Sequence, residues 1–235
     1  MTKRIPSGIK GLDELLQGGV PEKTVLLLLG PPGSGKSTLV TEAACSALDN
    51  KRRCIYAITS DSVHAAKVKM KLTGCDVTMY EDYSRFIDCF SWRYGKTSER
   101  GIKSLTDLTG LSVLIKDAVN ELGGKNMVLV LDSISDFLLY ADPNSVYKLL
   151  QIVAGIIKRS ENSFGVIVLE EGLHPPEVVN TLSYIVDGVI QMKLEGNKRL
   201  LRIQKMAETA HSLDWVEYEI KKGVEIVCVR EFFKG

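Results

Sequence analysis

Hydrophobic residues fall along this chain in short continuous runs that alternate with segments of helical periodicity. The runs at residues 24–29, 54–59, 86–90, 127–132 and 164–169 have the length and continuity of strands buried on both faces. Between them, residues 37–44, a segment ending near residue 72, and residues 108–122 and 145–158 have the apolar spacing of helices. This alternation predicts an α/β fold with a mostly parallel central sheet flanked by helices.

The C-terminal part has a different pattern. Residues 186–194, 200–205, 215–220 and 224–229 are predicted to be strands with little helix between them, which favours an antiparallel extension of the sheet. No internal repeat, low-complexity tract or long linker divides the chain. We therefore expect residues 1–235 to form a single domain.

Residues 30–37, Gly-Pro-Pro-Gly-Ser-Gly-Lys-Ser, fit the phosphate-loop (Walker A) pattern G-x-x-x-x-G-K-S/T. Glycines let such a loop turn tightly enough to direct several N–H groups at a β-phosphate, while Lys36 reaches the β- and γ-oxygens and the Ser37 hydroxyl binds Mg²⁺. A buried strand precedes the loop and a helix follows it, so the helix amino end adds partial positive charge. The predicted nucleotide-binding residues are Gly30, Pro31, Pro32, Gly33, Ser34, Gly35, Lys36, Ser37 and Thr38.

Asp132 ends the apolar run at residues 127–132. In a phosphate-loop enzyme an aspartate at this point lies near the magnesium ion, directly or through water. We therefore add Asp132 to the nucleotide site and predict Ser37 and Asp132 as the metal ligands for an ATP–Mg²⁺ complex.

Composition and charge narrow the class of protein. Hydrophobic residues make up 45% and charged residues 25%, as in soluble globular proteins. Thirty basic and 29 acidic side chains give a net charge of +1, so no overall field favours nucleic acid or a membrane as partner. The sequence shows neither a signal peptide nor an apolar run long enough to span a membrane, so we expect a cytoplasmic location and no membrane partner.

The five cysteines are odd in number and widely spaced, without a C-x-x-C pair. This spacing favours buried free thiols over disulfides or metal ligands. The three histidines also lack metal-ligand spacing.

Residues 4–21, RIPSGIKGLDELLQGGVP, resemble the opening of KaiC-type ATPases in the RecA superfamily. The phrase at residues 131–135 resembles that family's Walker B segment, and Lys205-Met206 with Thr209 and His211 resembles its late K-M-R-G-T-x-H segment. The resemblance covers nearly the whole chain as one KaiC-like domain. It implies a RecA-like phosphate-loop NTPase fold, ATP and Mg²⁺ as ligands, and a homo-oligomer, such as a hexameric ring, with nucleotide between subunits.

Two departures from the family concern hydrolysis. Where the family carries a Glu-Glu pair whose glutamate activates water, this chain has Ser60 and Asp61. Asp61 is a candidate catalytic base, although capping of the following helix explains it equally well. In the late segment, Lys205 remains as a residue for a neighbouring subunit's ATP, but Ala207 replaces the arginine. Because a trans-acting arginine accelerates hydrolysis by roughly 10³–10⁵, its loss predicts slow turnover unless a residue such as Arg202 substitutes.

Two further segments bear on function. Glu170 follows the fifth apolar run, where RecA-like folds sense the γ-phosphate, although an exposed loop carboxylate is the preferred interpretation. Residues 91–103 interleave Trp92 and Tyr94 with four basic residues, a composition suited to single-stranded DNA. The preferred interpretation is a surface loop, because recombinase DNA loops follow the Walker B strand whereas this segment precedes it.

The sequence thus favours an ATP-binding KaiC-like protein with slow, Mg²⁺-dependent hydrolysis at subunit interfaces. It would act as a nucleotide-gated regulator of an unknown protein partner. Alternatives are a sensor that does not hydrolyse ATP and a recombinase paralogue that binds single-stranded DNA in repair.

Overall fold

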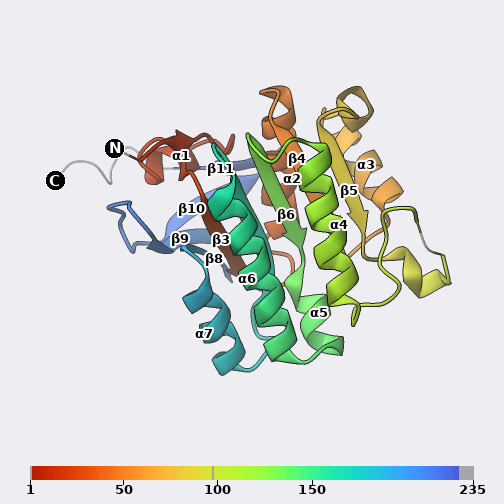
Figure 1. Ribbon diagram of the computed structural model, residues 1–235. Coiled ribbons are helices and arrows are strands. Elements are labelled where there is room, and N and C mark those ends of the chain that lie inside the picture. The colour runs from red at the N-terminus through yellow and green to blue at the C-terminus, as the bar shows by residue number, and fades with distance from the viewer. Residues whose placement is uncertain (1, 97, 228–235) are drawn as a thin grey trace.

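The computed structural model describes residues 2–96 and 98–227 and is built around one large sheet (Figure 1). Within these residues the sheet has nine strands in the order β11-β10-β9-β8-β3-β7-β6-β4-β5. Its strands are β3 (Thr24–Gly30), β4 (Arg53–Ile58), β5 (Ser84–Asp88), β6 (Met127–Asp132), β7 (Phe164–Glu170), β8 (Gly188–Glu195), β9 (Lys198–Met206), β10 (Val216–Ile220) and β11 (Val224–Ile226). Two short strands, β1 (Arg4–Ile5) and β2 (Val20–Pro21), pair separately.

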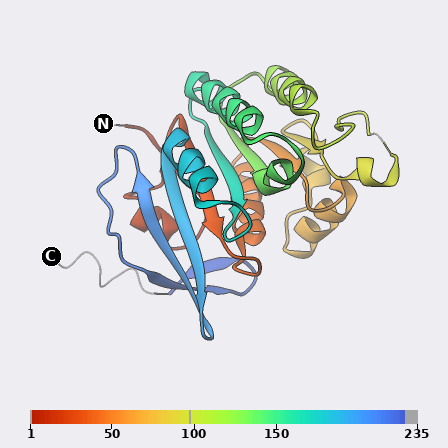
Figure 2. The same cartoon turned by 90° about the horizontal axis from the view of Figure 1, so that it is seen from below.

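Helices cover both faces of the sheet. They are α1 (Leu12–Leu15), α2 (Lys36–Asp49), α3 (Val63–Leu72), α4 (Leu108–Glu121), α5 (Ile134–Tyr140), α6 (Pro143–Arg159) and α7 (Pro176–Ile185), with 3₁₀ turns η1 (Val77–Tyr80) and η2 (Ser91–Tyr94). Figure 2, seen from below, shows α4, α6 and α7 on one side of the sheet and α2 and α3 on the other. None of the helices in the described ranges combines the length and apolar character of a membrane span.

Strand β3 shows why its continuous apolar run was a valid sign of a central strand. Leu26 and Leu28 join the core that contains α1, α2 and α3, whereas Val25, Leu27 and Leu29 join the core that contains α4, α5 and α6. Because successive side chains of a strand point to opposite faces, a strand covered on both faces must be apolar throughout. The predicted α/β architecture is confirmed.

The C-terminal strands follow the prediction with one difference. Strands β9, β10 and β11 extend the sheet in antiparallel fashion, but β8 pairs in parallel with β3. The reason is α7, which was not predicted and lies between β7 and β8 as a crossover connection, so β8 runs in the same direction as β7. Residues 228–229 of the last predicted strand lie outside the described residues.

The parallel register gathers the predicted site at one edge of the sheet. Gly30 at the end of β3 pairs with Glu170 at the end of β7, and Ile58 at the end of β4 pairs with Asp132 at the end of β6. In α/β sheets, ligands bind at the carboxyl ends of the parallel strands. This edge therefore carries the phosphate loop, Asp132 and Glu170 together.

Candidate functional site

The phosphate loop joins the end of β3 to the start of α2, as predicted. Gly33 and Gly35 adopt φ values of 80° and 91°, a left-handed conformation that favours glycine. A side chain at Gly35 would also meet Ile220, whose Cδ1 lies 2.4 Å from the position of a Cβ. Helix α2 begins at Lys36 without a side-chain cap, so the N–H groups of its first turn remain available to an anion.

Tyr218 on β10 holds the phosphate loop through a hydrogen bond. Its buried hydroxyl donates a hydrogen bond to the carbonyl oxygen of Ser34, and the Ser34 hydroxyl donates in turn to the carbonyl of Pro31 at 2.8 Å. Burial raises the pKa of Tyr218 to about 12, so the hydroxyl stays protonated as a donor at neutral pH. The C-terminal antiparallel strands therefore help to shape the loop.

Lys36 forms an ion pair with Glu170. The Lys36 Nζ lies 2.9 Å from Glu170 Oε2 and donates to the Pro31 carbonyl at 2.8 Å, and the lysine side chain is only 3% exposed. The preferred interpretation of Glu170 as an exposed loop carboxylate is therefore wrong. Glu170 is the last residue of β7, its side chain is 27% exposed, and the β3–β7 register places it beside the loop.

Asp132 lies beside the amino end of α2. It is 4% exposed, the Tyr56 hydroxyl donates to its Oδ2 at 3.2 Å, and the Ser37 hydroxyl lies close to it. Burial raises the pKa of Asp132, while the contacts with Ser37 and Tyr56 act in the opposite direction. A desolvated carboxylate next to a serine hydroxyl is the hard oxygen donor pair that Mg²⁺ prefers, so these residues fit the predicted metal.

Asp61 shares a small cavity with both predicted metal ligands. This cavity, of about 70 Å³, is lined by Ser37, Tyr56, Ser60, Asp61 and Asp132 among others. The Asp61 Oδ2 lies 2.7 Å from Lys69 Nζ, and this hydrogen bond lowers the pKa of Asp61. The helix-cap interpretation of Asp61 is wrong, because the N-cap of α3 is Ser62, whose hydroxyl accepts the N–H of Ala65 at 3.2 Å.

Lys205 lies away from the phosphate loop of its own chain. It pairs with Val189 near the amino end of β8, and its Nζ donates to the carbonyls of Ser183 and Val186 at 3.1 and 2.6 Å. The structure therefore brings together the predicted loop, Asp132 and Asp61, but not Lys205. A contact between Lys205 and ATP would have to come from another subunit.

The segment after Lys205 departs from the family's sequence and contains a residue in the left-handed conformation. Glu208, at the position of the family's glycine, has a φ of 56°, the left-handed conformation suited to glycine. Arg4 fixes this segment by donating to Glu208 O at 2.7 Å and to Thr209 Oγ1 at 2.6 Å. Arg202 is held within the chain, because its guanidinium donates twice to Gln191 Oε1, at 2.8 and 3.1 Å, and stacks on Trp215.

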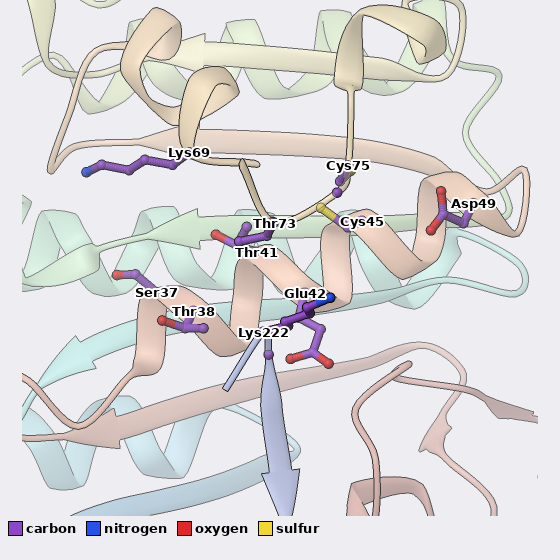
Figure 3. A pocket seen from close by; sticks show the side chains of 12 residues that line it. Ser37, Thr38, Thr41, Glu42, Cys45, Asp49, Lys69, Thr73, Cys75 and Lys222 are labelled. Carbon is purple, nitrogen blue, oxygen red and sulfur yellow. The ribbon is translucent and has the colours of Figure 1, made fainter. Parts of the chain in front are cut away.

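A larger cavity of about 540 Å³ opens beside Ser37 and Thr38 (Figure 3). Its walls are the exposed side of α2, the end of α3 with the following loop, and the turn between β10 and β11. They are formed by Ser37, Thr38, Thr41, Glu42, Cys45, Asp49, Lys69, Thr73, Gly74, Cys75, Lys222 and Gly223. Cofactor pockets have roughly this size, about 300–1,000 Å³. The sequence did not indicate this cavity, because its walls come from distant segments without a shared motif.

Two of the basic residues in the segment 91–103 form ion pairs within the chain. Arg93 pairs with Asp136 at 3.3 Å, and Arg100 pairs with Glu121 at 2.7 Å. The Trp92 indole donates to the carbonyl of Cys89 at 3.0 Å and packs against the core. These contacts fit the surface-loop interpretation better than a nucleic-acid interface.

The protein family that this chain matches is a family of ATPases, as its phosphate loop indicates. The family model described as "ATPase: KaiC" matches residues 5–231. The chain belongs to the KaiC family of ATPases. A UPF0273 protein of Thermotoga maritima is 30% identical to it over 96% of both chains. A UPF0273 protein of Pyrococcus horikoshii is also 30% identical, over 95% of this chain and 94% of its own.

A solved KaiC-like protein from Pyrococcus horikoshii OT3 has the same fold. The two superpose with a TM-score of 0.81 at 25% identity, covering 97% of this chain and all of the other. The resemblance drawn from residues 4–21 and the phosphate loop is thereby confirmed. Membership of the KaiC family supports the ATP-binding, phosphate-loop and RecA-like assignments made from the sequence.

Proposed function

We propose that this KaiC-family protein binds ATP with Mg²⁺, hydrolyses it slowly at subunit interfaces, and regulates a protein partner through its nucleotide state. The observation that carries the proposal is the ion pair between Lys36 and Glu170. Lys36 is the residue whose charge a phosphate-loop protein uses on the β- and γ-phosphates. Here the Lys36 charge already has a counter-ion, Glu170 at the end of β7. Nucleotide binding at Lys36 would therefore change the contacts of β7.

The binding part of the proposal assigns residues as follows. The N–H groups of residues 33–38 and the Lys36 ammonium hold the phosphates, and Ser37 and Asp132 hold Mg²⁺. When bound, Mg²⁺ neutralises charge on the β- and γ-oxygens. The cavity of about 540 Å³ beside Thr38 is the place for the nucleoside.

We attribute slow hydrolysis to the residues available to activate water and to stabilise the transition state. Asp61 shares a cavity with Ser37 and Asp132, so we assign it the role of polarising water. Its ion pair with Lys69 lowers its pKa and makes it a weaker base. Ala207 supplies no charge to a transition state, and Arg202 is held by Gln191 and Trp215.

The gating step is an exchange of partners at Lys36. Phosphate oxygens would replace Glu170 beside the Lys36 ammonium, and the released carboxylate would then move. Its neighbour Glu171 accepts a hydrogen bond from Gln191 at 2.8 Å, and Gln191 accepts two from Arg202. A change at the end of β7 therefore has a physical route to β8 and β9.

The proposal also includes assembly. Lys205 acts on ATP only across a subunit interface, so we propose a homo-oligomer, such as a hexameric ring. Each subunit is taken as one domain, residues 1–235, in the cytoplasm where ATP is available. Mixing Lys36→Ala subunits with Lys205→Ala subunits tests this arrangement. Shared sites would restore part of the hydrolysis in the mixture, whereas independent sites would leave it at the level of the two separate variants.

One experiment separates the ATPase from a sensor that does not hydrolyse ATP. The mass of the protein in solution is measured with and without Mg²⁺–ATP, alongside phosphate release, for the wild type and Lys36→Ala. We expect an ATP-dependent change in mass with slow phosphate release, both absent in Lys36→Ala. A change in mass without any phosphate release would favour the sensor, and identical behaviour of Lys36→Ala would overturn the site.

The recombinase alternative is less well supported, because Arg93 and Arg100 are engaged in ion pairs. Salt-dependent retention of single-stranded DNA tests it directly. Retention that is lost when Arg93, Lys96 and Arg100 are neutralised would favour this alternative.

A further inference from the structure

Two cysteines that are far apart in sequence meet in the wall of the cavity of about 540 Å³ beside α2. Cys45 lies on the cavity side of α2, and Cys75 lies in the loop between α3 and η1. Both line the cavity, and Figure 3 shows their side chains next to one another. Cys54 on β4 is close to both but is completely buried. Widely spaced sequence positions gave no indication of this arrangement.

The surrounding contacts hold the two thiols in this position. The Cys75 N–H donates to the carbonyl of Met70 at 3.0 Å, which fixes the loop to the end of α3. The Tyr80 hydroxyl donates to Asp49 Oδ1 at 2.7 Å, which fixes η1 to the end of α2. The segment that carries Cys75 is thus attached on both sides of the cysteine, and its thiol stays beside Cys45.

The two thiols are chemically unequal. The contact between them lowers the pKa of Cys75 and raises the pKa of Cys45. Burial raises the pKa of Cys54 to about 12, and burial also raises that of Cys89. Because the thiolate is the reactive form, Cys75 is the nucleophile among these four residues.

We propose that Cys45 and Cys75 are a redox modification site that closes into a reversible intramolecular disulfide in the wall of this cavity. Both residues line a space that a small oxidant can enter. A shared metal ion is the competing role for clustered thiols, but in residues 2–96 and 98–227 no three Cys, His, Asp or Glu residues gather as ligands.

The chemistry balances with a peroxide as oxidant. The Cys75 thiolate attacks one oxygen of hydrogen peroxide, the O–O bond breaks, and a sulfenic acid and hydroxide form. The Cys45 sulfur then attacks the Cys75 sulfur, the S–O bond breaks, the hydroxyl leaves, and the thiol proton of Cys45 goes to solvent. Overall, two thiols and one peroxide give one disulfide and two waters. A dithiol such as dithiothreitol reverses the change by exchange.

The consequence for ligand binding rests on the proposed function, in which this cavity receives the nucleoside. A disulfide bond of about 2.05 Å is shorter than any hydrogen-bonded pair of sulfur atoms. Its formation would draw Thr73 and Gly74 toward α2 and narrow the cavity. Oxidation should therefore weaken ATP binding, and bound ATP should cover the thiols and slow their oxidation.

Peptide mapping of the full wild-type chain tests the modification without relying on variants. Each of the five cysteines falls in a different tryptic peptide, with Cys45 in residues 37–51 and Cys75 in residues 72–85. After treatment with hydrogen peroxide and blocking of free thiols, we expect these two peptides to be linked. The link should vanish with dithiothreitol and in Cys45→Ser, and persist in Cys89→Ser. A link from Cys75 to Cys54, links between chains only, or oxidation without any link would overturn the proposal.

Calorimetric titration with ATP on the same samples keeps the two proposals distinguishable. We expect the oxidised chain to bind at least about fivefold more weakly than the reduced chain. Dithiothreitol should restore the affinity of the wild type, and peroxide should leave that of Cys75→Ser unchanged. A linked chain with unchanged affinity would overturn the effect on the cavity. A reduced chain that binds no ATP would instead contradict the proposed function and leave the mapped disulfide standing.

Discussion

Glu170 at the end of β7 and Lys36 at the start of α2 form an ion pair beside the phosphate loop, with 2.9 Å between Glu170 Oε2 and Lys36 Nζ. The lysine side chain is almost completely buried. A buried charge is stable only with a partner, so the proposed function has Lys36 exchange Glu170 for phosphate oxygens when nucleotide binds. In that proposal the loop acts as a switch as well as a binding site.

The first prediction concerns Glu170→Gln. Removing the carboxylate leaves Lys36 without its counter-ion, so the free energy of unfolding of the nucleotide-free protein should fall by about 1–3 kcal/mol. ATP no longer competes with Glu170, so its affinity should rise by up to about tenfold. Urea unfolding and calorimetric titration measure the two effects. Glu171→Gln is the control, since Glu171 accepts from Gln191 and not from Lys36. Weaker ATP binding in Glu170→Gln would contradict the exchange.

The second prediction concerns Tyr218→Phe. The change removes the donor to the Ser34 carbonyl while keeping the buried ring, so stability should fall by about 1 kcal/mol. The loop loses its support, and ATP should bind several-fold more weakly. Tyr184→Phe, at a side chain that is 85% exposed, should change neither quantity. Equal ATP affinities in Tyr218→Phe and the wild type would show that β10 does not shape the loop.

The third prediction concerns the base. Asp61→Asn should slow phosphate release while leaving ATP affinity close to that of the wild type, because Asp61 contacts Lys69 and not the loop. Placing glutamates at Ser60 and Asp61 gives the family's pair and should accelerate hydrolysis by about 10²-fold or more. Steady-state phosphate release measures both. Unchanged turnover in Asp61→Asn would remove Asp61 from the mechanism.

The sequence predicted the parts of this site that depend on neighbours along the chain. The loop, its strand and helix, and Asp132 at the end of an apolar run are all local patterns. Glu170 was misjudged because its partner Lys36 is fixed by the pairing of β3 with β7. Tyr218 was missed because it reaches Ser34 through the fold of the C-terminal strands. Such contacts depend on strand register, which no local pattern contains.

The direction of β8 was also outside the reach of local patterns. The apolar alternation located the strand, but the pairing with β3 depends on α7, a ten-residue helix that the sequence analysis did not predict. The gathering of Cys45, Cys54 and Cys75 has the same origin. Each lies on a different segment, and only packing of α2 against β4 and η1 brings them together.

The fourth prediction concerns pH and His174, which follows β7. Its Nε2 is buried without a hydrogen-bond partner in the described part of the chain. Burial lowers the pKa of His174, and the nearby carboxylates of Asp136 and Glu170 oppose this only in part. The unfolded chain therefore binds the proton more readily. Stability should be at its plateau above pH about 6.5 and should decline as pH falls through the lowered pKa of the folded state.

Substitution separates His174 from other groups that titrate in this range. His174→Gln should flatten the decline in the free energy of unfolding below pH about 6.5, whereas His64→Gln, at an exposed position, should leave it unchanged. Urea unfolding at several pH values measures the slopes. A steeper decline of the free energy of unfolding in His174→Gln would contradict a lowered pKa for His174.

The central claim is that the loop binds Mg²⁺–ATP and supports only slow hydrolysis. ATP binding and phosphate release, measured on one sample of wild type and one of Lys36→Ala, test it most directly. The wild type should bind one ATP per chain and hydrolyse it at no more than about 10⁻² per second, the scale of phosphate-loop proteins working without a partner. Lys36→Ala should bind none. ATP binding that survives Lys36→Ala, or wild-type turnover of tens per second, on the scale of an unassisted enzyme, would contradict the account.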